Sequence, residues 1–193
     1  MGAESLSGVF ADPARDAARA FRVCLNTMAR PGRIETITGA MPPAPLSVAA
    51  GTLLLTLCDT TTPLFLAGRF DTVALRDWLT FHTGAPIVGA GQAVFALGGW
   101  ADLATLARFA IGTVEYPDRS TTLIVEQAAL EAVGATLTGP GIKDRAGLNL
   151  PEIAAFRRNA ALFPLGLDFY FTAGSQVAAL PRSTRVADAR EPV

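Results

Sequence analysis

The chain has 193 residues, of which 50% are apolar and 17% are charged, and its formal net charge is −1. This length fits one domain, and the near-neutral charge argues against the basic surface that nucleic-acid binding requires. No apolar run approaches the roughly 18–20 residues that span a bilayer, so we expect no membrane segment. The first residues also lack the basic and apolar regions of a signal peptide, so a cytoplasmic protein is expected.

The N-terminal half alternates between helical and extended patterns. Asp12 and Pro13 are typical of a helix start, and Arg30 is followed by a Pro-Gly pair that ends a helix. Apolar residues recur at helical spacing between these signals, which predicts a helix. Further along we expect a strand at 33–38, a buried helix at 46–58, a strand at 63–67, a helix at 71–82 capped by Asp71, and strands at 86–88 and 93–97.

The C-terminal half continues the alternation. We expect helices at 102–111 and 151–162, and strands at 121–126, 135–138, 168–172 and 176–180. The last two strands are predicted to form an antiparallel pair around an Ala-Gly-Ser turn. Helices placed between strands favour an α/β fold, in which a mixed sheet is covered by helices in three layers (α/β/α). We expect a single domain over residues 1–193, with 187–193 as a loose tail.

Few residues in this chain are suited to metal binding or covalent catalysis. His82 is the only histidine and Lys143 the only lysine, and the two cysteines, Cys24 and Cys58, lie in apolar segments. The cysteines are interpreted as buried free thiols. A histidine-rich metal site cannot form within one chain, and Schiff-base chemistry would have to use Lys143. We therefore expect no bound metal.

Two glycine-containing stretches carry cations. Residues 137–145 (LTGPGIKDR) follow an expected strand, and their backbone amides, with Lys143 and Arg145, would suit a phosphate. The stretch matches neither G-x-x-x-x-G-K-[ST] nor G-x-G-x-x-G, and a turn that needs glycine flexibility is the alternative. Residues 28–33 (MARPGR) place two arginines around a Pro-Gly corner, which would suit either an anion or a solvated turn.

Two further stretches have both a functional and a structural interpretation. His82 ends a predicted helix, where it is either an acid–base group or a cap whose charge suits the helix dipole. Arg182 and Arg185 lie in residues 181–185 (PRSTR). They suit the recognition of phosphate or carboxylate, and equally the rim of a protein interface. None of these patterns alone identifies a substrate.

A series of short motifs extends from about residue 10 to residue 186. They are AFR (20–22), MARPGRI (28–34), LLTLCD (54–59), TP (62–63), FHTGAP (81–86), TLI (122–124), LTGPGI (137–142), FPLGLD (163–168) and LPRSTRV (180–186). Each motif is weak singly, but their order and combination are specific. In this respect the chain resembles the PhnH family, a subunit of the carbon–phosphorus lyase system that breaks down phosphonates.

This resemblance implies a fold similar to a truncated type I pyridoxal-phosphate (PLP)-dependent transferase, without PLP and without its Schiff-base lysine. It also implies a homodimer when isolated, and partners PhnG, PhnI and PhnJ in a core complex. The complex is implied to make ribose 1-phosphonate 5-triphosphate from ATP and an alkylphosphonate. The resemblance places the catalytic residues of the complex on the other subunits, so none is carried over to this chain.

Two functions therefore compete at the level of sequence. The first is a non-catalytic accessory subunit of the carbon–phosphorus lyase core complex. The second is a subunit that itself binds nucleotide or phosphonate in an arginine-rich pocket at a dimer interface. The residues that such a pocket would use are His82, Lys143, Arg145, Arg182 and Arg185. A working PLP enzyme, which would depend on Lys143, is disfavoured.

Overall fold

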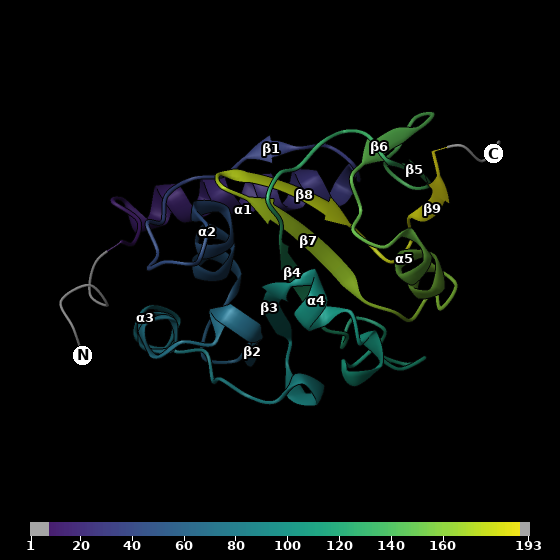
Figure 1. The fold of residues 1–193 in the computed structure, drawn as a ribbon. Helices are drawn as coiled ribbons and strands as arrows, with labels where there is room; N and C mark the ends of the chain where they lie inside the picture. The colour runs from purple at the N-terminus through teal and green to yellow at the C-terminus, as the bar shows by residue number, and fades with distance from the viewer. Residues whose placement is uncertain (1–7, 190–193) are drawn as a thin grey trace.

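A six-stranded mixed sheet forms the centre of the computed structural model, which describes residues 8–189 (Figure 1). The strands, in spatial order, are β1 (Glu35–Thr36), β8 (Gln176–Leu180), β7 (Asp168–Ala173), β4 (Thr122–Glu126), β3 (Phe95–Gly99) and β2 (Leu64–Leu66). Strands β2, β3, β4 and β7 run parallel to one another, and β8 and β1 add an antiparallel edge. The predicted mixed α/β architecture is confirmed.

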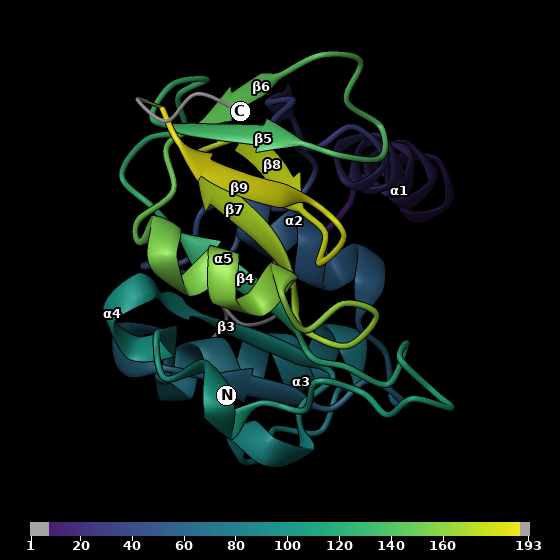
Figure 2. The ribbon, with the colours of Figure 1, turned by 90° about the vertical axis from the view of Figure 1, so that its right-hand side faces the viewer.

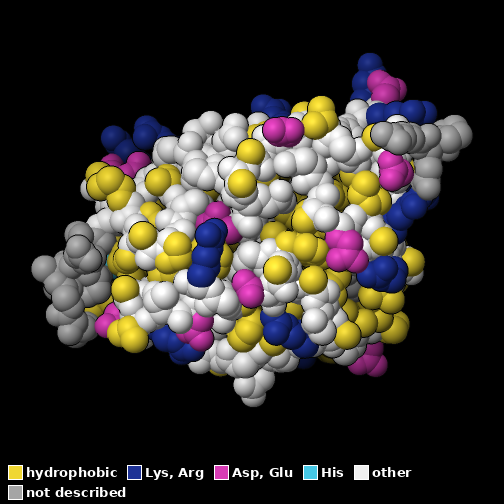
Figure 3. Space-filling model, in the orientation of Figure 1, with side chains coloured by type: hydrophobic (Ala, Val, Ile, Leu, Met, Phe, Trp, Pro, Cys, Tyr) yellow, Lys and Arg dark blue, Asp and Glu magenta, His cyan; other side chains and the backbone are white. Residues whose placement is uncertain are grey.

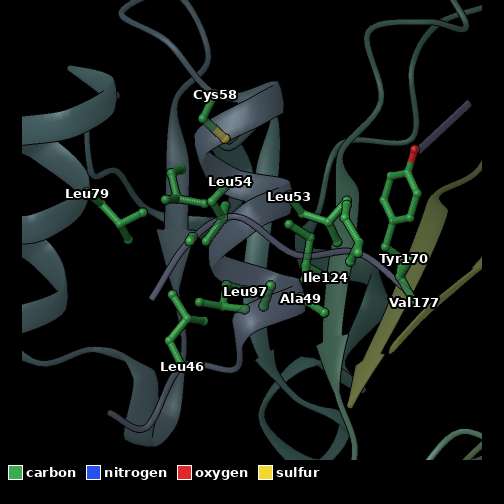
Figure 4. Packing of buried hydrophobic residues seen from close by; sticks show 14 of the residues in the cluster. Leu46, Ala49, Leu53, Leu54, Cys58, Leu79, Leu97, Ile124, Tyr170 and Val177 are labelled. Carbon is green, nitrogen blue, oxygen red and sulfur yellow. The ribbon is translucent and has the colours of Figure 1, made fainter. Parts of the chain in front are cut away.

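Three helices cover one face of this sheet: α1 (Pro13–Ala29), α2 (Val48–Leu57) and α3 (Val73–Thr83). Successive side chains of a strand point to opposite faces, so Tyr170 of β7 packs on this side. Helix α2 is buried along most of its length, and Figure 4 shows its Leu53 lying between the helix and Ile124 of β4. The short turn η2 (Gly68–Phe70) lies between β2 and α3, and the turn η3 (Ala90–Gln92) lies between α3 and β3.

The opposite face is covered by α4 (Trp100–Leu103), the turn η4 (Leu106–Arg108), α5 (Ile153–Ala160) and a second sheet. This small antiparallel sheet has the order β6 (Ala146–Leu148), β5 (Ala135–Thr138), β9 (Arg185–Asp188). Figure 2 shows α5 and the small sheet in front of β7, with α1 and α2 behind it. Phe156 of α5 anchors this side, because its ring packs edge-on against Phe169 at 4.9 Å and Phe171 at 5.6 Å between centroids.

Elements with strong local signals form as predicted. Asp12 caps α1 through its carboxylate, which accepts a hydrogen bond from the backbone N–H of Arg15 at 3.3 Å. Helix α2, strand β5 and the β7–β8 hairpin also lie where the patterns indicate. Within residues 8–189, no helix combines the length and the apolar character needed to cross a bilayer.

Two helix predictions need correction. Residues 102–111 do not form one helix, because α4 ends at Leu103 and η4 then turns the chain so that Phe109 is buried in the second core. Asp71 does not cap α3. The hydroxyl of Thr72 accepts the capping hydrogen bond from Leu75 N at 3.2 Å, whereas Asp71 forms an ion pair with Arg76.

Several strand predictions also differ in extent. The strand expected at 33–38 is reduced to the two residues of β1, and residues 86–88 contribute only an isolated bridge between Ile87 and Leu64. Ala187 and Asp188, expected in a loose tail, belong to β9 and pair with Thr136 and Ala135 of β5. The rest of the expected tail beyond residue 189 lies outside the described residues. Strands β6 and β9 were not predicted.

Candidate functional site

The turn that ends α1 meets the loop that joins β5 and β6. Figure 2 shows this loop reaching the C-terminal end of α1. Two glycines with positive φ permit the contact, Gly32 (φ 83°) and Gly141 (φ 81°). A Cβ on Gly32 would lie 2.8 Å from Ala146 Cβ, and one on Gly141 would overlap the carbonyl oxygen of Ala29. Two segments more than 100 residues apart in sequence are therefore brought into contact at their glycines.

A shallow pocket of about 340 Å³ lies between these two segments. Four of its lining residues are cationic: Arg30 and Arg33 from the turn, and Lys143 and Arg145 from the loop. The sequence had marked the two segments as separate anion-binding candidates. The structure joins them into one site, which is a step that neither pattern alone could predict.

The positive charge of this pocket is only partly compensated. Arg33 Nε lies 2.8 Å from Glu35 Oε1 in an ion pair. Arg30, Lys143 and Arg145 are exposed and form no ion pair with any residue between 8 and 189. Asp144 lies in the same loop and is exposed, but it does not line the pocket. The arrangement is suited to a multiply charged anion.

Arg182 lies outside this pocket, and its side chain is hydrogen-bonded to other residues of the fold. Its guanidinium donates to both carboxylate oxygens of Asp168, to the hydroxyl of Ser120 and to the carbonyl of Pro117. Its backbone N–H also donates to Asp168 at 2.8 Å. Through these hydrogen bonds Arg182 joins the start of β7 to the segment before β4. Its side chain is only 13% exposed, so few of its donors are left for a ligand.

Arg185 and His82 lie outside the cationic pocket. Arg185 is exposed on β9, opposite Thr138 at the end of β5. His82 lies in the last turn of α3, and its ring contacts those of Trp78 at 5.4 Å and Phe81 at 4.8 Å. Gly84, in the left-handed conformation, closes this helix end. Within one chain, therefore, only Lys143 and Arg145 of the five candidate residues share a pocket.

A buried carboxylate that sequence reasoning missed lies at the carboxyl end of β4. Glu126 is 9% exposed, and its Oε1 accepts a hydrogen bond from the backbone N–H of Ser47, the N-cap of α2, at 2.8 Å. Burial raises the pKa of Glu126, although the hydrogen bonds from Ser47 oppose this effect. Its only sequence signal was a charged residue closing the apolar run TTLIVE.

Within residues 8–189, no three His, Cys, Asp or Glu side chains come together as a metal site. A comparison with protein families matches residues 8–187 to the family described as "Bacterial phosphonate metabolism protein (PhnH)". The chain belongs to this family. The match covers the turn at the end of α1, the β5–β6 loop and Arg182, so the sites described above lie within the matched region.

Two named relatives are similar to this PhnH-family chain. The subunit PhnH of alpha-D-ribose 1-methylphosphonate 5-triphosphate synthase from Rhizobium meliloti (strain 1021) is 43% identical over 192 residues, covering 93% of this chain and 94% of the relative. The relative from Stutzerimonas stutzeri named "Putative C-P lyase subunit protein HtxG" is 28% identical over 173 residues, covering 86% of this chain and 84% of the relative. Both relatives are therefore matched over most of their length.

Proposed function

We propose that this chain is a non-catalytic accessory subunit of the carbon–phosphorus lyase core complex in organic phosphonate catabolism. It would support the formation of ribose 1-phosphonate 5-triphosphate from ATP and an alkylphosphonate. The observation that carries the proposal is the family match, together with the 43% identical relative that is named as a subunit of alpha-D-ribose 1-methylphosphonate 5-triphosphate synthase.

The placement of reactive side chains supports an accessory role. The His82 ring packs against aromatic rings, and both Cys24 and Cys58 are buried, with burial raising the pKa of each thiol to about 12. Thiols with such a pKa are protonated at neutral pH and are poor nucleophiles. Among the described residues, then, these groups are not arranged as the nucleophile–base pairs that covalent catalysis uses.

Exposed apolar side chains support contacts with other subunits. Phe21 and Leu25, one turn apart on the same face of α1, are 47% and 54% exposed, and Phe163 after α5 is 61% exposed. Figure 3 shows hydrophobic side chains spread over the face of Figure 1, including the side where α5 lies. Aromatic side chains such as Phe21 and Phe163 are enriched at protein interfaces. We propose PhnG, PhnI and PhnJ as partners, and a homodimer for the isolated chain.

The fold would correspond to a truncated type I PLP-dependent transferase in a single domain. The parallel strands β2, β3, β4 and β7 support the proposed fold. The absence of PLP is supported by Lys143, which is exposed in the β5–β6 loop, whereas a Schiff-base lysine is desolvated in an apolar pocket. We propose that the chain binds no cofactor and acts in the cytoplasm.

Co-expression with the other subunits tests the accessory role. The chain would be produced with PhnG, PhnI and PhnJ, the complex isolated through a tag on PhnI, and product formation followed by phosphorus NMR. We expect the chain to co-purify, and its omission to abolish formation of the triphosphate product. A complex that forms without this chain and retains full activity would overturn the proposal.

The alternative function is a subunit that itself binds nucleotide or phosphonate. One observation favours it: Lys143 and Arg145 share a pocket with Arg30 and Arg33. His82, Arg182 and Arg185, which the sequence also suggests for such a pocket, lie elsewhere in the single chain. The two functions are compatible, because an accessory subunit can contribute a binding site without a catalytic group.

A further inference from the structure

We infer that the pocket between the turn after α1 and the β5–β6 loop binds the phosphoryl chain of a triphosphate compound, held by Arg30, Arg33, Lys143 and Arg145. The choice of a triphosphate rests on the proposed function, since a triphosphate is the product of the proposed complex. The existence of an anion site rests on geometry and charge alone.

Unpaired cations are concentrated at this pocket. Elsewhere, arginines of the described chain are mostly paired with carboxylates, as Arg158 is with Glu152, or lie over rings, as Arg119 does over Tyr116. Among residues 8–189, Arg22 and Arg185 are the other cations with neither kind of partner. Like charges gathered in one place repel one another, and a bound polyanion would relieve that repulsion.

The backbone holds these cations in place from both sides. Arg30 and Arg33 flank a turn closed by the hydrogen bond from Arg33 N to Arg30 O at 3.1 Å, and the opposite loop contains a turn from Ile142 N to Gly139 O at 3.2 Å. Between the arginines, Pro31 and Gly32 are buried. The side chains therefore extend from two fixed turns, which lowers the entropy lost when an anion binds.

The size of the pocket selects among phosphorylated ligands. Its 340 Å³ is at the low end of small-molecule sites, which accommodates a phosphoryl chain with the nucleoside outside. Guanidinium groups bind pairs of oxygens, and Lys143 supplies a point charge. A phosphonate alone carries fewer charges and would bind more weakly. Nucleic-acid binding proteins carry an extended basic surface, whereas this chain has four cations at one pocket and a net charge of −1. Nucleic acid is therefore not the expected ligand.

Calorimetry of the purified full chain tests this inference with inorganic tripolyphosphate, ATP and methylphosphonate. We expect tripolyphosphate and ATP to bind with similar affinity, methylphosphonate to bind more weakly, and added salt to weaken all three. Substitutions Lys143→Ala and Arg145→Ala should each weaken tripolyphosphate binding about tenfold, because each removes a charge-assisted contact. Arg22→Ala and Arg185→Ala, which remove unpaired cations outside the pocket, should change it less than about twofold.

Three outcomes would overturn the inference. They are no binding of tripolyphosphate at millimolar concentration, binding of ATP without tripolyphosphate, or equal losses in the pocket and control variants. If no small anion binds and the Lys143→Ala/Arg145→Ala protein also fails to co-purify with PhnI, the pocket contacts an acidic partner surface instead. Co-purification of the unsubstituted chain is scored separately, so failure of the accessory role is distinguishable from failure of this site. Unchanged thermal unfolding shows that the exposed substitutions leave the fold intact.

Discussion

The backbone of Gly141 packs directly against the carbonyl oxygen of Ala29. A Cβ at position 141 would overlap this oxygen, so only glycine fits there without a shift of the backbone. This contact fixes the β5–β6 loop against the end of α1. It therefore determines whether Lys143 and Arg145 lie beside Arg30 and Arg33. The cationic pocket depends on a position that carries no functional group.

Gly141→Ala should therefore destabilise the protein and disturb the pocket. We expect a loss of roughly 2–4 kcal/mol in the free energy of unfolding, from the strain of a positive φ and from overpacking. Gly174→Ala is the matched control, since its φ is 58° but a Cβ there would have no neighbour within 4 Å. It should cost only the strain, about 1–2 kcal/mol. Urea unfolding measures both, and equal losses would contradict the role of the Ala29 contact.

The Arg182–Asp168 ion pair should contribute to stability rather than to binding. Arg182→Met would leave the carboxylate of Asp168 without its main partner, at an expected loss of about 3 kcal/mol. Arg76→Met removes an ion pair that is far more exposed, with 46% and 37% of the Arg76 and Asp71 side chains accessible, and should change stability little. Thermal unfolding of both variants checks this contrast. A similar small effect in both would return Arg182 to the list of ligand-binding candidates.

Elements with local signals were predictable from sequence, and those that depend on tertiary pairing were not. Helix α1 carries its own cap at Asp12, and the β7–β8 hairpin carries its own turn. Strands β6 and β9 are three and four residues long and form only because each pairs with β5. Phe109 ends the helical pattern of residues 102–111, since its burial in the second core requires a bend that periodicity does not show.

The candidate site illustrates the same limit. Its two cationic turns could be recognised separately, because Pro-Gly and Gly-Pro-Gly are strong turn signals. Their proximity could not, because it depends on Gly32 packing against Ala146 from a distant strand. Arg182 is a ligand-binding candidate from its residue type alone. The sequence does not show that its guanidinium donates hydrogen bonds to Asp168 and Ser120.

Both thiols should be unreactive in the folded protein. Cys24 and Cys58 are buried, and burial raises the pKa of each to about 12. At pH 8 the thiolate fraction is then very small, and access is blocked as well. We expect a thiol reagent such as DTNB to label both cysteines only after denaturant is added, at the rate of global unfolding. Rapid labelling of Cys58 alone would show that the end of α2 opens locally.

Glu126 should make the protein less stable as the pH rises through the mildly acidic range. Its pKa is raised in the folded state by burial, so the folded protein binds the proton more tightly than the unfolded chain does. As pH rises above the ordinary value of 4.5, the unfolded chain loses its proton first and stability falls. Glu126→Gln removes this titration and keeps an oxygen that can accept from Ser47 N. The variant should therefore gain stability relative to the wild type between pH 4 and pH 8.

Asp59 provides a control of opposite sign. Hydrogen bonds from Thr61 lower its pKa, so its ionised form stabilises the folded state and the contribution is lost as pH falls. Asp59→Asn should lose stability relative to the wild type at pH 8, and the difference should shrink on acidification. Urea titrations at several pH values measure both variants. If the Glu126→Gln difference is independent of pH, the Ser47 hydrogen bonds and the nearby Arg69 charge fully offset the burial of this carboxylate.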